Sequence, residues 1–580
     1  MYVHSVQVRN FRGIGELDWH VGGRLVCLVG QNDSTKTTAL DAIEFALCPR
    51  WSLLFTEADF HGGRSDRGEI TIRVTVGDIP DDSPLLDEVS KFGLYVRGVK
   101  EDERKVSDEL ESGYFKALTV QLKIDSSCEP EWTVIAARDP EGRRISWRDR
   151  QSLGVARLEG DADQDLSWSR QSNLTKLAGG EADIEGVLAD AQRRLKDAVE
   201  KGDIGRLNQA AKEAEEAARK LGVSPLQGYK PGLDPRHVSF RSGSFALHDG
   251  DIPLRAAGMG TRRLVALAVQ RASVRHGAVV LADEIDLGLE PHRVRRLLRN
   301  LRDNLDSPVT DDRVPLGQVI MTTHSAIPLL ELKRQDIRVV RSNGGRTEIL
   351  SPGPDATEIT KRVPSAFFAR KVVVCEGPTE VGLIRSIEDR WAQDHEGRPL
   401  PHEGVEVVNG EGSNAPARAK ALAALKYRVA FFGDSDKLRP TVKQDMLDSE
   451  ITVIVWNGKA STEQRLARDL PVSGLRELIA LGTELRCLES IRDSMAARLE
   501  LIEKKAEVAD PADLSAWLRL GANEERVREA VGLAAKEMEW FKTIEWGQRL
   551  GCLLEKHLAD MPDTDLAQKL RTLESWCYGG

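Results

Sequence analysis

Hydrophobic and polar residues alternate in a way that predicts strands and helices from the start of the chain. Residues 3–8 alternate and residues 25–29 form a short apolar run, so we expect both segments to be strands. Helical spacing follows at 36–47, and further strands are expected at 70–76 and 118–124. This order of strands and helices is typical of an α/β fold.

Between residues 183 and 221 the pattern changes to long amphipathic helices. Apolar residues recur with helical spacing, as Ile184, Val187, Leu188 and Leu195 do, so they share one face of a helix. Gly202 interrupts the segment. We predict a helical hairpin inserted into the α/β part. Such a pair can pack on its own domain or form a dimer contact, and the pattern leaves both alternatives open.

The α/β alternation returns after Pro231 and continues in a second unit. Strands are predicted at 278–282 and 318–322, with an arginine-rich helix at 291–305 between them, and residues 351–364 are typical of a connection between domains. Four further strands alternate with helical stretches, at 371–375, 405–408, 428–432 and 451–456. This alternation favours a doubly wound parallel sheet, followed from about residue 462 by a mostly helical region.

Composition limits the class of protein. Of 580 residues, 41% are hydrophobic and 30% charged, which is typical of a soluble globular protein with several domains. The formal net charge is −10, so a DNA partner requires local basic surfaces. The seven cysteines include no CxxC pair, which argues against a zinc knuckle. With no signal peptide and no apolar run of ~18 residues, we expect a cytoplasmic protein without a membrane partner.

A candidate phosphate-binding loop lies between the strand at 25–29 and the helix at 36–47. Backbone N–H groups and the helix N-terminus would surround phosphates, Lys36 would reach the β and γ oxygens, and Thr37 would hold Mg²⁺. Thr35 stands where GxxxxGK[ST] has its second glycine, which is costly where φ is positive. The predicted nucleotide-binding residues of the loop are Gly30, Asn32, Ser34, Thr35, Lys36, Thr37 and Thr38.

The second half of the same unit supplies the remaining parts of an ATP site. The strand at 278–282 ends in Asp283, suited to binding Mg²⁺, and Glu284, suited to activating water. His324, at the end of the next strand, can sense the γ-phosphate. Gly258 and Gly260 lie in a glycine-rich turn that opens a helix.

These features in this order resemble the ABC-type ATPases of recombination and chromosome maintenance, whose N-terminal strand is similar to VQVRNFRG at 6–13. The resemblance implies a signature loop at 258–261, a D-loop at 287–291 and two ATPase heads that sandwich ATP. The departures at Thr35 and in the signature loop bear on the rate of hydrolysis more than on nucleotide binding.

Acidic residues follow the strands of the second unit. Glu376 and Glu380 follow the first strand, Asp434 and Asp436 the third, and Glu463 the fourth. Because ligands of parallel sheets bind at the carboxyl ends of the strands, we expect these acids to converge on Mg²⁺ or Mn²⁺. We place Glu376 and Asp434 on one ion and Glu380, Asp436 and Glu463 around a second, with the Ser461 hydroxyl as a further ligand.

This region resembles the TOPRIM domain, whose motif is a strand-end Glu followed by an Asp-x-Asp pair. A topoisomerase would add a tyrosine nucleophile and a primase usually a zinc module. The additional Glu380 and the triplet 461–463 resemble the nuclease branch instead. That resemblance implies that Lys542, in the segment 539–543, completes the catalytic site.

An ABC-type ATPase followed by a TOPRIM domain resembles the OLD family of endonucleases, which includes Gabija anti-phage nucleases. The resemblance implies nucleotide-regulated, metal-dependent DNA cleavage in a homo-oligomer, a dimer or tetramer, which can work beside a UvrD-like helicase. We divide the chain into an ATPase (1–180 and 226–355), a helical dimerisation segment (181–225), and a TOPRIM domain with C-terminal helices (365–580). The alternative is an ATP-switched DNA-binding scaffold whose TOPRIM domain does not cut.

Overall fold

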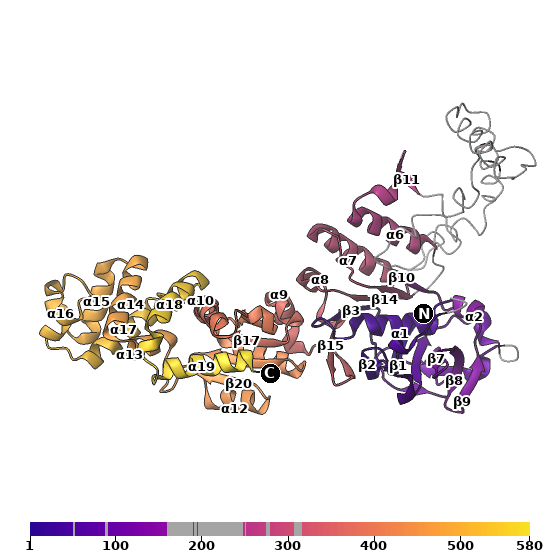
Figure 1. Ribbon diagram of the computed structural model, residues 1–580, viewed down its shortest axis with the longest axis horizontal. Helices are drawn as coiled ribbons and strands as arrows, with labels where there is room; N and C mark the ends of the chain where they lie inside the picture. Colours follow the sequence, from indigo (N-terminus) through magenta and orange to yellow (C-terminus); the bar gives the residue numbers. More distant parts are fainter. Residues whose placement is uncertain are drawn as a thin grey trace, which may run out of the picture.

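The computed structural model describes residues 1–49, 53–87, 91–158, 190, 194, 247–249, 251–273, 279–306 and 316–579. The described part is elongated, with a large mixed sheet at one end, a small sheet in the middle and a group of C-terminal helices at the other end (Figure 1). The helical hairpin predicted at 181–225 lies outside the described residues, apart from positions 190 and 194. Among the described helices, none has both the length and the apolar character needed to cross a bilayer.

The large sheet joins fourteen strands of the described chain. They are β1 (Tyr2–Phe11), β2 (Ile14–His20), β3 (Leu25–Val29), β4 (Ile70–Gly77), β5 (Arg97–Val99), β6 (Val106–Ser107), β7 (Phe115–Ile124), β8 (Pro130–Ala136), β9 (Asp139–Arg144), β10 (Val155–Leu158), β13 (Val279–Ala282), β14 (Gln318–Thr322), β15 (Ile337–Asn343) and β16 (Arg346–Leu350). Neighbouring strands in the order β10-β13-β14-β3-β15 are parallel, whereas β1, β2, β4, β7, β8 and β9 pair antiparallel. The ends of β3, β13 and β14 therefore lie side by side.

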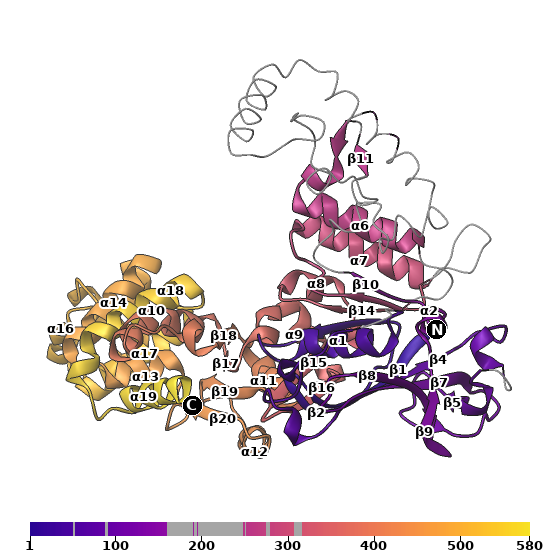
Figure 2. The same ribbon diagram turned by 45° about the vertical axis from the view of Figure 1, so that its right-hand side comes forward.

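Helices cover the parallel part of this sheet on both sides. They are α1 (Lys36–Leu47), α6 (Met259–Ser273), α7 (Pro291–Leu305) and α8 (Ala326–Glu331), while α2 (Trp147–Gln151) precedes β10, and β11 (His248–Asp249) pairs with β12 (Ile252–Pro253). In both views α6 and α7 lie beside one another over β10 and β14 (Figures 1 and 2). All five residues of β3 are buried, as expected for a strand covered on both faces.

Several elements have the predicted bounds, notably α1, α7, β3 and β14. The segment between β1 and β3, where the pattern predicts no strand, contains the strand β2. Its apolar residues are irregularly spaced, and they become buried only through antiparallel pairing, with Trp19 opposite Val6 and Leu17 opposite Val8. Local periodicity therefore does not predict this strand.

The small sheet confirms the doubly wound parallel arrangement predicted for the second unit. Its order is β18-β17-β19-β20, and every pair is parallel. The strands are β17 (Lys371–Cys375), β18 (Val405–Asn409), β19 (Arg428–Gly433) and β20 (Thr452–Val455), with helices α10 (Pro378–Asp394), α11 (Ala415–Ala424) and α12 (Pro440–Asp448) between them. The carboxyl ends of β17, β19 and β20 consequently meet at one edge.

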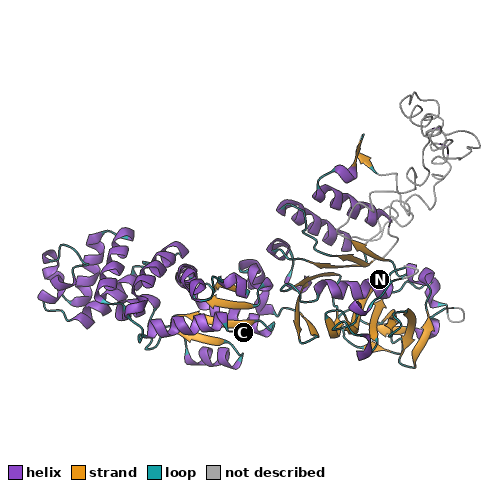
Figure 3. Ribbon diagram, in the orientation of Figure 1, coloured by secondary structure: helices purple, strands orange, loops and turns teal. Residues whose placement is uncertain are grey.

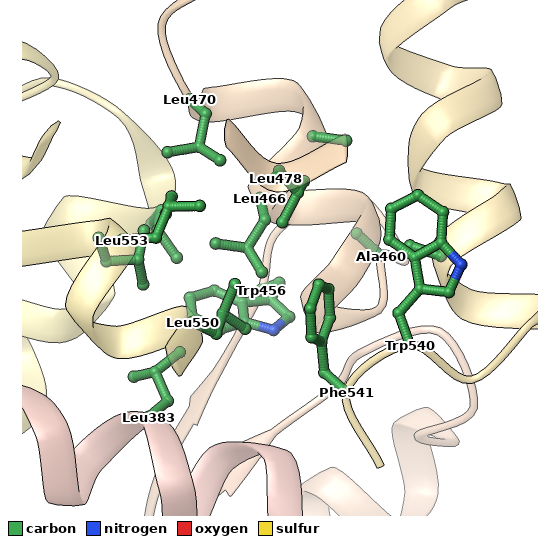
Figure 4. Packing of buried hydrophobic residues seen from close by; sticks show 14 of the residues in the cluster. Leu383, Trp456, Ala460, Leu466, Leu470, Leu478, Trp540, Phe541, Leu550 and Leu553 are labelled. Carbon is green, nitrogen blue, oxygen red and sulfur yellow. The ribbon is translucent and has the colours of Figure 1, made fainter. Parts of the chain in front are cut away.

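The C-terminal region is helical, as predicted (Figure 3). It contains α13 (Thr462–Asp469), α14 (Val472–Leu485), α15 (Leu488–Leu499), α16 (Leu514–Arg519), α17 (Glu524–Glu537), α18 (Ile544–His557) and α19 (Asp565–Tyr578). An apolar core joins these helices to the small sheet, and in it Trp540 and Phe541 lie near Trp456 and Leu550 (Figure 4). Helix α18 packs closely on α10, because a Cβ on Gly382 would lie 2.2 Å from the Ile544 carbonyl oxygen.

The segment expected as a simple connection between the two units is a packed part of the fold. It forms α9 (Thr357–Arg362) and a 3₁₀ helix, Pro364–Phe368. Ile359, Ala366 and Phe367 are fully buried in an apolar cluster that also contains residues of β14, β15, β17 and β19. The large-sheet unit and the small-sheet unit therefore share one continuous core.

Candidate functional site

The phosphate loop has the backbone shape expected of a nucleotide site. Gly30 has φ +150°, and a Cβ there would lie 2.6 Å from the Val340 carbonyl oxygen, so glycine is required. Thr35 lies at the N-cap of α1 with φ 68°, in the left-handed region where the usual motif has glycine. The Thr35 hydroxyl lies 3.0 Å from the Thr347 hydroxyl and also donates to the Ser34 carbonyl, which fixes this strained position.

Lys36 lies inside the phosphate loop. Its ammonium donates to the carbonyl oxygens of Gly30 and Gln31, at 3.0 and 2.7 Å, and lies 3.3 Å from the Ser34 hydroxyl. Burial is the largest influence and lowers the pKa of Lys36 to about 8. Asn32 and Thr37 are exposed and Thr38 is half-buried, all beside the N-terminus of α1. Phosphate oxygens would offer the Lys36 ammonium stronger partners than these carbonyls.

Asp283 and Thr37 come together as predicted from opposite halves of the ATPase. The Thr37 hydroxyl lies 3.3 Å from Asp283 Oδ1, and the Thr322 hydroxyl donates to the same oxygen at 2.5 Å. Arg157 Nη2 lies 3.3 Å from Asp283 Oδ2 and 3.0 Å from Asp41 Oδ1. Sequence reasoning missed Arg157, because nothing local marks an arginine in a short strand as a partner of a distant aspartate.

The remaining ATPase residues lie on the loops after β13 and β14 and at the start of α6. Glu284 has φ 47°, and its N–H donates to the Thr322 hydroxyl at 2.8 Å. Partial burial of the His324 ring, followed by the nearby Lys36 charge, lowers the pKa of His324. A Cβ on Gly260 would lie 2.5 Å from the Gly288 carbonyl, so the signature turn packs on the D-loop of its own chain, whereas a Cβ on Gly258 would meet no atom within 4 Å.

The first two acids of the small sheet are linked directly. Glu376 follows β17, and its Oε2 accepts a hydrogen bond from the Asp434 N–H at 2.8 Å. Gly433, the last residue of β19, makes room for this contact, because a Cβ there would lie 2.6 Å from the Glu376 Cβ. The predicted convergence of the ends of β17 and β19 is therefore present in the structure.

Thr462 joins Glu380 to Asp434. Its hydroxyl lies 2.8 Å from both Glu380 Oε1 and Asp434 Oδ1, and its N–H donates to Asp434 Oδ1 at 2.6 Å. The same hydroxyl accepts a hydrogen bond from Trp456 Nε1 at 2.9 Å. Sequence reasoning assigned a hydroxyl ligand to Ser461, but the Ser461 hydroxyl instead accepts from the Gln464 N–H and caps α13. Thr462 is therefore the hydroxyl that lies between the carboxylates.

Glu463 is the most deeply buried acid of the group. Its side chain is 1% exposed, and within the described chain neither carboxylate oxygen accepts a hydrogen bond. Lys542 Nζ lies 3.6 Å from Glu463 Oε1. The segment 539–543 thus folds back to this edge, where the buried Phe541 and the bond from the Thr379 hydroxyl to the Phe541 carbonyl, 2.6 Å, hold it. The catalytic role of Lys542 stays a prediction.

Asp436 has a cationic partner that the sequence did not reveal. Lys536, in the last turn of α17, pairs with Asp436 Oδ2, while Asp436 Oδ1 is buried without a hydrogen bond from the described residues. Lysine is common on solvated helix faces, and only the packing of α17 against α13 brings this one to the site. Two lysines, Lys536 and Lys542, therefore approach the acids from the same C-terminal segment.

Three of the clustered acids, Glu376, Glu380 and Asp434, resist ionisation. Burial, followed by the repulsion of neighbouring acids, raises the pKa of Asp434 to about 8, and burial raises the pKa of Glu380 to about 7. Burial also raises the pKa of Glu376. Burial alone would lower the pKa of Lys542, but the field of Glu463 and Asp434 outweighs it and raises the pKa, so the ammonium stays charged. A cation at this edge would relieve the repulsion.

The donor set fits a hard divalent cation. All five acids offer oxygen ligands, and Glu463 and Asp436 keep buried oxygens without hydrogen-bond partners in the described chain. Among the described residues, however, no three acidic, histidine or cysteine side chains are already grouped as ligands of one ion. The two predicted ion sites are therefore not preformed. Thr462 is hydrogen-bonded to Glu380 and Asp434, and Lys536 pairs with Asp436. Ion binding requires these contacts to rearrange.

Comparisons with known proteins agree with this architecture. Residues 25–331 match the family described as "AAA domain, putative AbiEii toxin, Type IV TA system". Residues 367–436 match "Overcoming lysogenization defect protein-like, TOPRIM domain". A search of curated proteins finds no match.

A search of solved structures finds similarities at low sequence identity, among them the following three. An SMC head bound to the C-winged helix domain of ScpA is 14% identical with a TM-score of 0.34, covering 61% of this chain and 99% of its own. The SMC head of Thermotoga maritima is 14% identical with a TM-score of 0.29, covering 60% and 99%. The recombination mediator RecF with ATPrS is 13% identical with a TM-score of 0.32, covering 60% and 98%.

The family match at residues 25–331 spans more than half of the chain and contains the whole predicted ATP site. The second match ends at Asp436, the last residue of the Asp-x-Asp pair. The chain therefore belongs to the family of this AAA-type ATPase domain and carries, after it, a TOPRIM domain like that of the overcoming-lysogenization-defect proteins, a combination consistent with an ATP-dependent OLD-family nuclease.

Proposed function

We propose that this protein is a nucleotide-regulated, divalent-metal-dependent DNA endonuclease whose cutting centre is the acidic edge of the small sheet. One observation carries the proposal: Glu463 is buried among three other acids with both oxygens free of hydrogen bonds from the described chain. A buried carboxylate with no donors is costly, so such a group is kept where a cation neutralises it. A lysine beside it suits a reaction in which charge develops on a phosphate.

The residues at this edge divide the work. Glu376, Glu380, Asp434, Asp436 and Glu463 would hold one or two Mg²⁺ or Mn²⁺ ions. Bound ions would supply a nucleophilic hydroxide and stabilise the attacking and leaving oxygens of a phosphodiester. Thr462 orients Glu380 and Asp434 through its hydroxyl and N–H. The Lys542 ammonium would stabilise charge on a non-bridging phosphate oxygen.

The ATPase would regulate this centre. Lys36 and the N-terminus of α1 would bind the phosphates of ATP, Thr37 and Asp283 would hold Mg²⁺, and Glu284 would activate water. In the ABC-type ATPases that this unit resembles, two heads sandwich ATP, so a second copy of the chain would present its signature turn to the bound nucleotide. We therefore propose a homo-oligomer, with the segment 181–225 as a candidate contact.

Plasmid nicking tests the proposal. Supercoiled plasmid is incubated with wild type, Glu376→Ala or Asp434→Ala in Mg²⁺ or Mn²⁺, with and without ATP. We expect nicked or linear product only from wild type. Glu406→Ala is the matched control, because Glu406 lies in β18 of the same sheet but three residues before the strand end. Wild-type nicking by both site variants would disprove the assignment.

The scaffold alternative predicts a different outcome from the same experiment. A purified chain that binds DNA and ATP but never nicks, in either metal, would support a TOPRIM domain that does not cut. The resemblance to the Gabija nuclease GajA adds a role in anti-phage defence and a UvrD-like helicase partner to the proposal. Phage plaques are counted on cells that express wild type or Asp434→Ala, with and without a co-expressed UvrD-like helicase. Loss of protection by Asp434→Ala would support that part of the proposal.

A further inference from the structure

A group of exposed cations borders the acidic edge of the small sheet. We define the basic rim as Lys437, Arg439, Lys443 and Lys459, all of which are exposed. Within the described ranges none of the four forms an ion pair, in contrast to Lys420 and Lys426, which pair with Asp445 and Glu348. Four unpaired cations close together repel one another, so their grouping favours an anionic partner.

The rim is held together by the two loops that also carry the acids. Lys437 directly follows Asp436, and Lys459 lies three residues before Thr462. These loops are bonded to each other, because the Ser435 N–H donates to the Ala460 carbonyl at 3.1 Å and the Ala460 N–H donates to the Ser435 hydroxyl at 3.0 Å. The position of Lys459 relative to Lys437 is therefore set by backbone contacts.

Helix α12 extends the rim away from the acids. Arg439 is its N-cap, and Lys443 lies one turn further on the same face, since its N–H donates to the Arg439 carbonyl at 3.0 Å. Helix α12 lies beside β20 at the outer edge of the small sheet (Figures 1 and 2). The rim thus runs from the acidic edge outward along one side of the sheet.

The charge of the basic rim indicates which kind of partner binds to it. The whole chain carries a formal charge of −10, so it repels polyanions except where cations are concentrated. A single small anion would need donors that converge on one point, whereas the rim spreads its charges along a line from the loop to the second turn of α12. The phosphates of a nucleic-acid backbone are likewise a series of separate charges along a strand, and Asp436 directly precedes the first residue of the rim.

We infer that the basic rim binds the phosphodiester backbone of duplex DNA on one flank of the bond to be cut. The inference rests on the proposed function, because it specifies how the substrate of the same centre is held. Each phosphate contact releases counterions, so the rim contributes affinity that falls as salt rises. Because the rim residues lie outside the acidic cluster, this contribution is separable from cleavage.

The test measures binding without cutting. Fluorescence anisotropy of a labelled DNA duplex in EDTA gives the Kd over a series of KCl concentrations for the full chain. The rim variant combines Arg439→Gln, Lys443→Gln and Lys459→Gln, and leaves Lys437 in place because it adjoins Asp436. The matched control combines Lys361→Gln, Arg476→Gln and Lys504→Gln, which removes the same charge at exposed positions away from the small-sheet edge.

We expect the rim variant to bind about tenfold or more weakly, with a salt slope smaller by about two to three, since each contact contributes about 0.9. The control variant should bind like wild type. Unchanged affinity and slope in the rim variant, or an equal loss in the control, would overturn the inference. Thermal unfolding of both variants checks folding, and if the triple variant is unfolded, each single substitution should lower the slope by about one.

Nicking assays on the same proteins separate this inference from the proposed function. If wild type binds DNA through the rim but never cuts in Mg²⁺ or Mn²⁺, the proposed nuclease is wrong, and of the inference only the binding of duplex DNA by the rim stands. If wild type cuts while the rim variant keeps full affinity, the nuclease stands and the inference is wrong.

Discussion

Single hydroxyl groups and backbone positions determine much of both sites. Thr35 adopts a left-handed backbone conformation in the phosphate loop, although it lacks the conformational freedom of glycine. The hydrogen bond between its hydroxyl and that of Thr347 stabilises this strained conformation. Thr462 does comparable work among the acids, since one hydroxyl contacts two carboxylates and an indole N–H. The motif already singles out Thr35 in the sequence, whereas only the structure shows that the Thr462 hydroxyl lies between the carboxylates.

Replacing Thr462 isolates the contribution of its hydroxyl. Thr462→Val keeps the volume but leaves the buried Trp456 N–H without an acceptor, which costs about 1–3 kcal/mol. We expect a lower melting temperature and weaker Mn²⁺ binding by calorimetry, with Thr462→Ser restoring both. Equal behaviour of the valine variant and wild type in both measurements would contradict the role given to the hydroxyl.

The raised pKa values of the acids predict how the stability of the metal-free chain depends on pH. Burial raises the pKa of Glu380 to about 7 and that of Asp434 to about 8, whereas the unfolded chain ionises near pH ~4. The stabilising protons are therefore fully present below about pH 4, and the stabilisation is lost as the pH rises through 7 and 8. In EDTA we expect the melting temperature to fall as the pH rises from about 4 to about 8.

A neutral amide in place of one acid checks the origin of that pH dependence. Glu380→Gln removes a titrating group, so its melting temperature should fall less steeply with pH than that of wild type. Glu406→Gln, in the same sheet but away from the edge, should keep the wild-type dependence. A wild-type slope in Glu380→Gln would place the titration elsewhere.

At the scale of elements, contact between α10 and α18 positions Lys542 at the acidic edge. Gly382 and Gly547 lie against the facing backbones, where an added Cβ would come within 2.2 Å of the Ile544 carbonyl and 2.4 Å of the Thr379 carbonyl. Because α18 begins two residues after Lys542, any separation of the helices displaces the lysine. The site therefore depends on two glycines outside it.

Adding methyl groups at this contact should disturb stability and cleavage together. Overpacking costs about 1–3 kcal/mol, so we expect Gly382→Ala and Gly547→Ala to melt at a lower temperature and to nick plasmid more slowly. Gly353→Ala is the control, because a Cβ there meets no atom within 4 Å. Wild-type nicking rates in both helix variants would show that the α10–α18 spacing does not determine the position of Lys542.

Elements with strong local signals could be predicted from the sequence, and elements made by distant pairing could not. The four strands of the small sheet are short, mostly apolar segments with β-branched residues, and the predicted bounds agree with the structure within one residue at each end. The antiparallel β2 was missed because cross-strand partners bury it. The strand-end acids follow the strands of the small sheet and were predicted as a group. Lys536 and Arg157 were not predicted, because only tertiary packing brings Lys536 to Asp436 and Arg157 to Asp283.

At the scale of the whole molecule, a short chain of contacts joins the phosphate loop to the acidic edge. Gly30 lies against the carbonyl of Val340, and the next residue, Arg341, donates to the Lys426 carbonyl at 2.7 Å and lies 4.2 Å from the Tyr427 ring centroid. Lys426 also pairs with Glu348. Tyr427 immediately precedes β19, which ends at Gly433, the residue directly before Asp434.

These contacts predict that Arg341 carries part of the effect of nucleotide on cleavage. Arg341→Gln should reduce the difference between nicking with and without ATP, while ATP affinity and nucleotide-free nicking stay near wild type, because the residue touches neither site. Arg64→Gln, an exposed arginine paired with Asp66, is the control. An unchanged response to ATP in Arg341→Gln would exclude this route.

The core shared by the two units also bears on modularity. Ile359, Ala366 and Phe367 lie in one cluster with strands of both sheets, so dividing the chain between 355 and 365 would expose apolar surface on both pieces. Replacing either half by that of a related protein should therefore disrupt the shared core. Expressed separately, each half should aggregate or need the other half in order to fold. A destabilising substitution on one side of this core would lower the stability of both domains. Substitutions in the ATPase and in the small-sheet domain should therefore compensate one another in evolution.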